Sequence, residues 1–480
     1  MSVQIFLQGK LIGIEPFLLA PAADGSPAGE RLVVGRAHWI TLLSEVLPRA
    51  LLSRLGLAKV LLGTSGGGGF LLVLPRESLD AARSFCNKAD SQIRRMSGQT
   101  LRLATAWTEN LGDWTTVRRR LSTEMWRTRN TDPSAALAFH APFTEIAAGN
   151  DDYFTAYLTE RFREAQTCGW SAEEPARILL GEGSLQWAIR SGTDAIPIAR
   201  HTALNEEGTA PADTVTLASR AQGRPVWGVL RADVDGFAVR ARQLLTVEEH
   251  VQLSVLFKQF FAGELELGCS LGEYWRKVTI LYSGGDDFAV YGAWDALLLL
   301  ARELERLFRL FSETNLKDFP GPEGKTITMA LALAPDADTP FAPVYREAGR
   351  GLETAKSADR DCFHVFGRTI EWRHLAHSSG LKDNMLRMVS EFGCPPEFLE
   401  ELGGFYHEKP AGRTDRPWRY HRRLALVLGP HKDRELLRLR TALITDIIGK
   451  SPSQVRLRPA GRVALEWARL LMESQLDEVR

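Results

Sequence analysis

The sequence predicts an α+β fold with two ferredoxin-like (βαββαβ) domains, a small helical linker domain and a C-terminal helical bundle. Three observations support this fold class. A chain of 480 residues is long enough for about three domains. One order of strands and helices occurs twice, and the chain after Trp372 has a helical pattern interrupted by glycines and prolines.

The second copy of the repeated order has the more complete pattern. Its β-rich run ends in DVDG, and two later apolar runs flank SGGDD, which is a hairpin signal. The predicted elements are a strand at 226–234, a helix at about 239–261, hairpin strands at 277–282 and 288–291, a helix from Asp295 to about Phe311, a strand at 326–334, a helix at 344–358 and a closing strand at 362–366. This order is βαββαβ with one extra helix after the hairpin.

The N-terminal copy has the same order. Its predicted elements are a strand at 3–7, a helix at about 37–55, a hairpin in LLGTSGGGGFLLVLP, a helix from Ser78 and a strand at 101–106. The turn SGGGG, which starts at Ser65, aligns with SGGDD, which starts at Ser283. Both copies therefore have the glycine turn, but only the second has the acids.

The two copies divide the chain into four expected domains. These are a first ferredoxin-like domain at 1–131, a linker at 132–223, a second ferredoxin-like domain at 224–371 and a C-terminal helical domain at 372–480. The linker alternates helical patterns such as YFTAYLTERFREA with polar stretches such as NEEGTAPADT, which is typical of a small helical insert with a loop.

Composition excludes several function classes. Lysine plus arginine equals aspartate plus glutamate at 59 each, so no global field attracts nucleic acid or a membrane. The five cysteines are scattered singly with no CxxC pair or Cys/His cluster, so we expect buried thiols in a reducing cytoplasm and no zinc. The N-terminus lacks an export signal and the longest apolar streak lies in a charged helix, so we expect no membrane association.

The SGGDD turn is the strongest candidate for chemistry. Two glycines let a ligand approach the backbone, and Asp286 and Asp287 place carboxylates in the same space. Asp233 ends the neighbouring strand, and in a βαββαβ sheet that strand lies beside the hairpin. Three carboxylates near one another repel unless cations bind, which suits Mg²⁺ or Mn²⁺ and two-metal phosphoryl or nucleotidyl transfer.

Simpler interpretations exist for each signal. GGDD is also a favourable solvated turn, and DVD is a common strand end; their combination in one complete unit is what indicates a metal–nucleotide site. Lys356 is either a phosphate contact or a solvated helix lysine. Ser283 and Ser65 either contact phosphate or cap their turns. The basic run from Arg413, with Trp418 and Tyr420, is either a contact for RNA or an acidic partner or a solvated helix face.

Together, these motifs resemble those of a known family, the large polymerase–cyclase subunit of type III CRISPR effector complexes. YSGGDDF with the upstream DVD resembles the second palm domain of that family. GKLIGIEPF, VVGRAHWITLL and LLGTSGGGGFLLVLP are similar to its first palm, and the similarity extends to the C-terminal VALEWARLLMES. The two ferredoxin-like domains are therefore identified with the two palms.

The resemblance implies an RNA-guided antiviral subunit that converts ATP into a cyclic oligoadenylate or related adenylate messenger when the complex binds target RNA. It implies Asp233, Asp286 and Asp287 as catalytic metal ligands. It further implies a nucleotide site made by Ser283, Gly284, Gly285, Gly236, Phe237, Lys356, Ser65, Gly66, Gly67 and Gly68. The implied partners are the guide 5′-end-binding subunit, the small helical subunit, CRISPR RNA and target RNA.

Three departures from the family change what we expect. The chain starts at the first palm without a histidine–aspartate nuclease domain, so we expect no DNase activity. The linker lacks CxxC pairs, so we expect it to fold by packing without zinc. Lys10 stands where the family commonly has an acid, which favours a non-catalytic acceptor site in the first palm.

Two other functions compete with the cyclase. A diguanylate cyclase has one such palm, usually with a glutamate in the hairpin and an upstream RxxD site; here the palm is doubled, both acids are aspartate and the upstream segment reads RKVT. A non-catalytic palm scaffold of the same complex would keep the acids for folding or for binding nucleotide without turnover. The intact DVD and GGDD favour turnover.

Overall fold

The first palm has the predicted order of elements. A computed structural model describes residues 3–130, 150–189, 195–407, 418–430, 433–447 and 458–477. The palm consists of β1 Gln4–Ile12, α1 Ile14–Leu18, α2 Glu30–Arg54, β2 Leu62–Gly66, β3 Gly69–Pro75, α3 Leu79–Met96 and β4 Arg102–Glu109. Its sheet has the order β2-β3-β1-β4, with every pair antiparallel. Helix α2 begins earlier than expected because Leu32, Val33 and Val34 are also buried.

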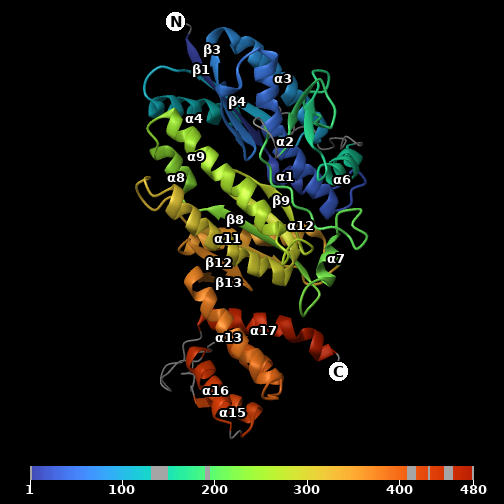
Figure 1. Cartoon of the computed structure of the whole chain (residues 1–480), viewed down its shortest axis with the longest axis vertical. Coiled ribbons are helices and arrows are strands. Elements are labelled where there is room, and N and C mark those ends of the chain that lie inside the picture. The colour runs from blue at the N-terminus through green and yellow to red at the C-terminus, as the bar shows by residue number, and fades with distance from the viewer. Residues whose placement is uncertain are drawn as a thin grey trace.

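The first sheet has a helix on each face. Helices α2 and α3 pack on one face, while α4 Trp114–Asn130 packs on the other through Trp114, Val117 and Leu121. Figure 1 shows α4 lying beside α9 of the second palm. Arg118 of α4 donates from Nη1 to the carbonyl of Ala241 at 2.6 Å, so α4 joins the two palms.

The second palm contains the βαββαβ unit plus an extension. Its elements are β8 Trp227–Val234, α8 Phe237–Gln243, α9 Val247–Gln259, α10 Leu265–Ser270, β9 Val278–Ser283, β10 Asp287–Ala293, α11 Trp294–Asn315, β11 Ile327–Leu333, α12 Phe341–Ala358, β12 Cys362–Val365 and β13 Arg368–Glu371. The sheet order is β13-β12-β11-β8-β10-β9. The strand that closes the unit beside β8 is therefore β11, and the expectation that the strand at 362–366 closes it was wrong. Strand β12 instead adds to β11 in parallel.

The prediction of one helix at about 239–261 was also wrong in one respect, because the structure has two helices there. Helix α8 ends at Gln243, and α9 starts after Thr246. Thr246 Oγ1 accepts from Glu249 N at 3.1 Å, and the Glu249 carboxylate accepts from Thr246 N, so the pair forms a capping box. The TVEE sequence carries this signal, and the apolar periodicity across it conceals the break.

In its described residues, 150–189 and 195–223, the linker is less helical than the sequence predicts. Its elements are a π-helical turn at Tyr153–Leu158, α6 Thr159–Arg161, β5 Thr167–Trp170, β6 Leu179–Leu180, β7 Leu185–Ala188 and α7 Thr214–Ser219. The three strands pair antiparallel in the order β6-β5-β7. Each is only two to four residues long, too short to produce a clear alternating pattern in the sequence.

The C-terminal region is helical, as predicted. It consists of α13 Trp372–Ser390, α14 Glu397–His407, α15 Trp418–Leu428, α16 Arg434–Ile447 and α17 Pro459–Asp477 (Figure 1). Helix α17 also packs on the second palm, because Val463, Trp467 and Leu470 belong to that palm's apolar core. The start of the basic run, 413–417, lies outside the described residues.

The two palms and the linker share one apolar core. It includes Leu42 and Val46 of α2, Cys168 of β5, and Trp227 and Tyr291 of the second sheet. The five cysteines, Cys86, Cys168, Cys269, Cys362 and Cys394, are free and buried, as the sequence predicts. Because first-palm and second-palm side chains pack in the same core, the two glycine turns face each other on a common support.

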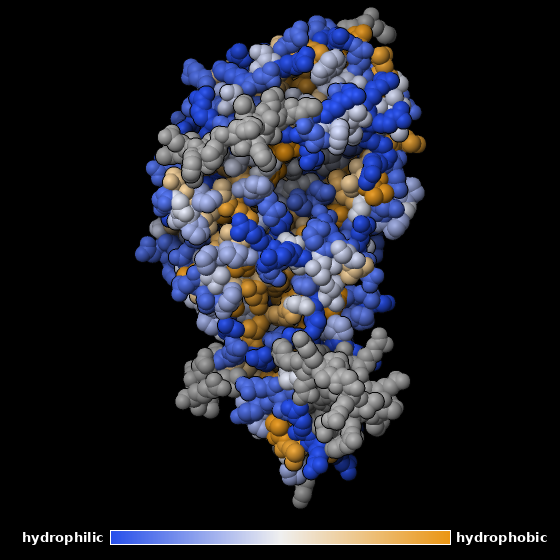
Figure 2. All heavy atoms as spheres, turned by 180° about the vertical axis from the view of Figure 1, so that it is seen from behind, coloured by the Kyte–Doolittle hydropathy of each residue, from blue (hydrophilic) through white to orange (hydrophobic). Residues whose placement is uncertain are grey.

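The surface is mainly hydrophilic where it can be seen. Figure 2 shows a largely hydrophilic face with hydrophobic residues gathered toward the middle of the molecule. Within the described residues, no helix combines the length and the apolar character needed to cross a membrane.

Asp235, the second acid of DVD, anchors the fold. Its buried carboxylate accepts from Thr326 Oγ1 at 2.8 Å, from Thr328 Oγ1 at 2.7 Å and from Asp361 N at 2.9 Å. These bonds tie the end of β8 to β11 and to the start of β12. The two acids of DVD therefore have different roles. Because side chains alternate along a strand, Asp233 and Asp235 point to the same side of the chain, opposite to Val234. Of the two, only Asp235 is buried.

We expect Asp235→Ala to lower the free energy of unfolding by about 2–4 kcal/mol, since it leaves buried donors without an acceptor. Urea denaturation of the purified chain measures this loss. Asp338→Ala, at an exposed aspartate, is the control and should change stability by less than about 0.5 kcal/mol. Equal stability of the two variants would contradict the anchoring role.

Candidate active site between the two palms

The tip of the acidic hairpin lies against the end of β8. Asp287 of β10 is the Cα partner of Asp233 of β8. Val234 N donates to the carbonyl of Asp286 at 2.9 Å, and Gly284 N donates to the carbonyl of Asp287 at 2.7 Å. The backbone therefore brings the three predicted carboxylates to one end of the sheet, as the sheet order of a βαββαβ unit requires.

The glycine turns of the two palms meet each other. Gly66, Gly67 and Gly68 have φ of 115°, 56° and 74°, in the left-handed region that favours glycine. A Cβ atom added to Gly67 would lie 3.2 Å from the backbone nitrogen of Gly285. Glycine is thus required in the first-palm turn both by its conformation and by its close approach to the second-palm turn.

Two cavities of similar size lie next to this turn contact. The first, of about 280 Å³, contains Asp286 and is called here the Asp286 cavity; the second, of about 260 Å³, contains Asp287 and is called the Asp287 cavity. Gly67, Ser283 and Gly284 line both cavities. The consecutive acids Asp286 and Asp287 thus face different cavities, Asp286 from the bend of the turn and Asp287 from the first residue of β10.

Burial and mutual repulsion raise the pKa of all three acids. Burial, with the charges of Asp287 and Asp233, raises the pKa of Asp286 to about 7, against the opposite effect of Lys356 and Lys10. Burial and Asp233 raise the pKa of Asp287 to about 6, opposed by Arg231. Burial also raises the pKa of Asp233, although Lys356 favours its charged form.

The donor set fits a hard divalent cation, because carboxylate oxygens are the ligands that Mg²⁺ and Mn²⁺ prefer. Lys356 Nζ lies 2.8 Å from Asp233 Oδ2, so an ammonium group already occupies one cation position. Among the described residues, no three His, Cys, Asp or Glu side chains stand close enough together to bind one ion. Asp233 is paired with Lys356, and Asp286 and Asp287 face separate cavities, so their side chains do not form a closed three-carboxylate site.

We expect Asp286→Asn to raise the unfolding temperature of the metal-free protein by several degrees at pH 8. The folded pKa of about 7 exceeds the ordinary 3.8, so ionisation of Asp286 destabilises the fold progressively as pH rises above about 4. The gain should therefore shrink at pH 5, where the folded carboxyl is mostly protonated. Thermal unfolding with a chelator at both pH values tests this, with Asp338→Asn as the control; an equal gain at both would contradict the assignment.

The remaining predicted residues take several positions. Ser283 lines both cavities and donates from Oγ to the carbonyl of Phe261 at 2.7 Å. Phe237 and Gly285 line the Asp286 cavity. Gly236 has φ of 70° and lies against Glu323, and it is not among the residues that line either cavity. Sequence reasoning placed Gly236 at the nucleotide site, but the loop before α8 turns it toward Glu323.

The first-palm turn also lies where the sequence predicts it. Ser65 and Gly66 line the Asp286 cavity, Gly68 lines the Asp287 cavity, and Gly67 lines both. Lys10, the lysine that replaces an acid, lines the Asp286 cavity. The first palm therefore contributes a lysine, a serine and glycine backbone to the space in front of Asp286.

Sequence reasoning missed five side chains at the site. Glu45 and Lys258 lie in the Asp286 cavity, while Arg231, Tyr282 and Tyr345 lie in the Asp287 cavity. The Arg231 guanidinium lies 4.4 Å from the centre of the Tyr345 ring. The charged members carried a signal, since Glu45 and Lys258 are lone charges inside the apolar runs LLSEVL and VLFKQFF, and Arg231 interrupts the apolar run that leads to Asp233. Their partners were not predictable, because they come from other elements.

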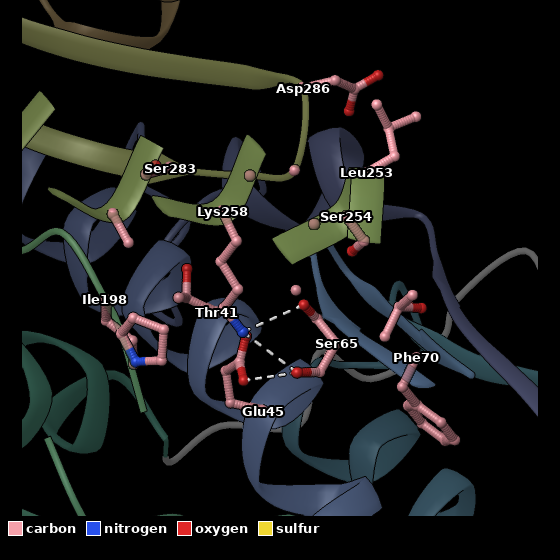
Figure 3. Close-up of a pocket in the computed structure, with 18 of the residues that line it drawn as sticks. Thr41, Glu45, Ser65, Phe70, Ile198, Leu253, Ser254, Lys258, Ser283 and Asp286 are labelled. Carbon is pink, nitrogen blue, oxygen red and sulfur yellow. Dashed lines mark hydrogen bonds and ion pairs between the residues drawn. The ribbon is translucent and has the colours of Figure 1, made fainter. Parts of the chain in front are cut away.

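Figure 3 shows how the missed charges lie in the Asp286 cavity. Lys258 extends from α9 toward Glu45 of α2 and Ser65 of β2. Ser65 Oγ donates to Glu45 Oε2 at 2.8 Å. Asp286 lies on the turn at the far side of the cavity from this cluster. One wall thus holds an acid of the second palm and the opposite wall holds a charged cluster shared by both palms.

Comparison with known proteins agrees with this architecture. Residues 226–364 match the family described as Cas10/Cmr2, second palm domain. A curated relative, the CRISPR system single-strand-specific deoxyribonuclease Cas10/Csm1 (subtype III-A) of Thermococcus onnurineus, is 26% identical over 192 residues, 35% of this chain and 23% of its own length. The protein of the same name from Mycobacterium tuberculosis is 29% identical over 157 residues, 29% of this chain and 18% of its own. These matches cover less than a quarter of either relative.

Solved structures share the fold over nearly the whole chain. A Csm1–Csm4 cassette in complex with cA4 has a TM-score of 0.73 at 17% identity, covering 98% of this chain and 70% of that chain. The Csm1–Csm4 subcomplex of the type III-A CRISPR–Csm interference complex has a TM-score of 0.71 at 18% identity, covering 100% of this chain and 70% of that one. The predicted resemblance is thereby confirmed at the level of fold and of the second palm.

Proposed function

We propose, on the premise that residues 226–364 form a second palm domain of the Cas10/Cmr2 family, that this chain joins ATP molecules by metal-dependent nucleotidyl transfer into a cyclic oligoadenylate or related adenylate messenger. One observation carries the proposal: an acidic turn and a glycine turn meet between two cavities of about 280 and 260 Å³. Two similar cavities beside one acidic turn suit a donor and an acceptor nucleotide. Among the proteins of similar fold are cassettes in complex with AMPPNP, one ATP and cA3.

Different residues of the second palm would bind the cation and the phosphate. Asp233, Asp286 and Asp287 would hold Mg²⁺ or Mn²⁺, which when bound activates the attacking hydroxyl and neutralises charge on the transferred phosphate. Cation binding would release Lys356 from Asp233 and free its ammonium for phosphate. Gly284 and Gly285 have no side chain, so they allow a phosphate to approach the backbone.

The first palm would hold the acceptor. Ser65, Gly66, Gly67 and Gly68 line the cavities with backbone and one hydroxyl, and Lys10 adds a positive charge. In the Asp287 cavity, the half-buried Tyr282 offers aromatic surface beside which an adenine ring can stack. Phe237 contributes apolar wall, and Gly236 supports the loop that precedes α8.

We further infer that the chain works within an RNA-guided effector complex in the cytoplasm. The proteins of similar fold were solved as Csm1–Csm4 cassettes. The proposed partners are therefore a guide 5′-end-binding subunit, a small helical subunit, CRISPR RNA and target RNA. Five free, buried cysteines support a reducing compartment.

The test is to incubate the assembled complex with target RNA, Mg²⁺ or Mn²⁺ and labelled ATP, and to identify the product by mass spectrometry. The proposal predicts oligoadenylate that depends on both target RNA and metal. Absence of any product would favour the scaffold function. A product formed from GTP in preference to ATP would favour the diguanylate-cyclase alternative.

The absence of DNase activity and of zinc stays a prediction. The curated relatives are named single-strand-specific deoxyribonucleases, so cleavage is the activity to test directly. Single-stranded DNA cut by the complex, with equal cutting after Asp286→Asn plus Asp287→Asn, would contradict the prediction. Stoichiometric zinc in purified protein would contradict the prediction for the linker.

A further inference from the structure

A buried ion pair connects the two palms beneath the first-palm turn. Glu45 of α2 has a side chain that is 2% exposed, and Lys258 of α9 has one that is 20% exposed. Lys258 Nζ donates to Glu45 Oε1, and also to the carbonyl oxygen and Oγ of Ser65, both at 3.2 Å. Arg49 Nη1 donates to Glu45 Oε2 at 2.7 Å. The second palm thus contacts the first-palm turn directly through a side chain (Figure 3).

We propose that Lys258 and Glu45 are positioning residues that hold the Ser65–Gly68 turn against the acidic turn and so place the acceptor nucleotide. This inference rests on the proposed function and adds two residues to it. Neither residue supplies a metal ligand; both act through the backbone and hydroxyl of Ser65.

The turn has backbone support but no side-chain packing of its own. Leu11 N donates to the carbonyl of Gly68 at 2.7 Å, and the β2–β3 pairing extends to Gly66 and Gly69. Gly66, Gly67 and Gly68 have no side chains to pack, and glycine loses more conformational freedom on ordering than any other residue. Glu45 lies directly behind them, since a Cβ atom added to Gly66 would come within 3.2 Å of Glu45 Oε1. The hydrogen bonds of Lys258 and Glu45 to Ser65 therefore substitute for the side-chain packing that the glycines lack.

A role in stability alone does not explain the pair. Burying two charges is expensive, and well-packed apolar residues at such positions are often as stable or more stable. Lys258 lies in the apolar run VLFKQFF and Glu45 in LLSEVL, where apolar residues would continue the core. The charges are instead directed at a segment of the first palm that contacts the acidic turn.

The cluster also suits an anionic ligand. Burial lowers the pKa of Lys258, which Glu45 opposes. Burial would raise the pKa of Glu45. The opposite effect is larger and holds that pKa below its ordinary value, because the positive charges of Lys258 and Arg49 and the hydrogen bond from Ser65 favour the charged carboxylate. Two cations around one carboxylate leave one excess positive charge beside the Asp286 cavity, the sign that attracts a triphosphate.

The test compares Lys258→Met with Lys277→Met. Lys277 is a matched control, since its Nζ lies 2.9 Å from Asp295 Oδ2, its side chain is 23% exposed and it lies outside both cavities. In the full-length chain, hydrogen–deuterium exchange of the Ser65–Gly69 amides should accelerate about tenfold in Lys258→Met and stay unchanged in Lys277→Met. In the assembled complex, kcat should fall about tenfold or more in Lys258→Met and within twofold in Lys277→Met.

Two further variants keep the test decisive. Lys258→Arg should restore part of kcat, because it can still pair with Glu45. If Lys258→Met does not fold, Ser65→Ala replaces it, because that change removes the hydroxyl bonded to Lys258 and Glu45 and leaves Glu45 paired with Lys258 and Arg49. Unchanged exchange of the turn and unchanged kcat would overturn the positioning role. Faster exchange in a complex whose wild type forms no product would overturn the proposed function and keep the positioning role.

Discussion

Replacing Asp286 and Asp287 by asparagine is expected to reduce the rate of adenylate synthesis by about 10²–10⁴-fold. Asparagine keeps the size of each side chain and removes the negative charge, so the cost reports cation binding and not packing. The range corresponds to several kcal/mol of lost transition-state stabilisation, as expected when a catalytic cation is lost. Rates of product formation by the assembled complex, with saturating target RNA and Mn²⁺, measure it.

Two controls separate loss of chemistry from loss of structure. Asp338→Asn changes an exposed aspartate and should leave the rate within twofold. The double aspartate variant should remain folded and should be more stable than wild type without metal at pH 8, because burial and carboxylate repulsion, which raise the pKa of Asp286 to about 7, no longer act on a charged group. Product formed at the wild-type rate by this variant would exclude the acidic turn as the active site.

Gly284→Ala is expected to reduce activity by about 10²-fold without unfolding the protein. A Cβ atom at Gly284 would lie 2.1 Å from Asp287 Oδ1, so the methyl group must displace that carboxylate. A displacement of about 1 Å at a reacting centre costs about this much in rate. Mn²⁺ affinity, measured by calorimetry, should fall together with the rate.

The neighbouring glycine provides a matched comparison. A Cβ atom at Gly285 would meet nothing within 4 Å, and no left-handed φ is recorded there. Gly285→Ala should therefore keep the wild-type Mn²⁺ affinity, and any loss of rate in this variant reports obstruction of the nucleotide. If Gly284→Ala keeps both Mn²⁺ affinity and rate, Asp287 is not held in place by the turn.

Most elements could be predicted because their patterns are local. Apolar, β-rich runs marked β8, β9 and β10, alternation marked β11, and the glycines between β2 and β3 marked the first hairpin. Errors occurred where the deciding signal was a short motif or strand, or where it was a contact between residues far apart in the chain. The capping box at Thr246 divides one apolar pattern into α8 and α9, and the small linker sheet is made of strands too short to show alternation.

The assignment of the closing strand failed for a topological reason. Strands β11 and β12 have similar apolar sequences, and nothing local decides which of them lies beside β8. The structure places β11 there, where Asp235 accepts hydrogen bonds from Thr326 and Thr328. Neither the threonines nor the aspartate carries a distinctive sequence signal. Asp235 anchors the fold only because the tertiary structure brings both hydroxyls to its carboxylate.

The sequence by itself determined the doubled order of elements, the glycine turns and the position of Asp233, Asp286 and Asp287 at strand ends. Those features depend on residues close together in the chain, where side-chain alternation and turn chemistry act. Only the tertiary structure decided that Asp286 and Asp287 face different cavities and that Lys258 meets Glu45, 213 residues away in the chain. The physical reason is that a buried charge needs a partner within hydrogen-bonding distance, and packing of whole domains selects that partner.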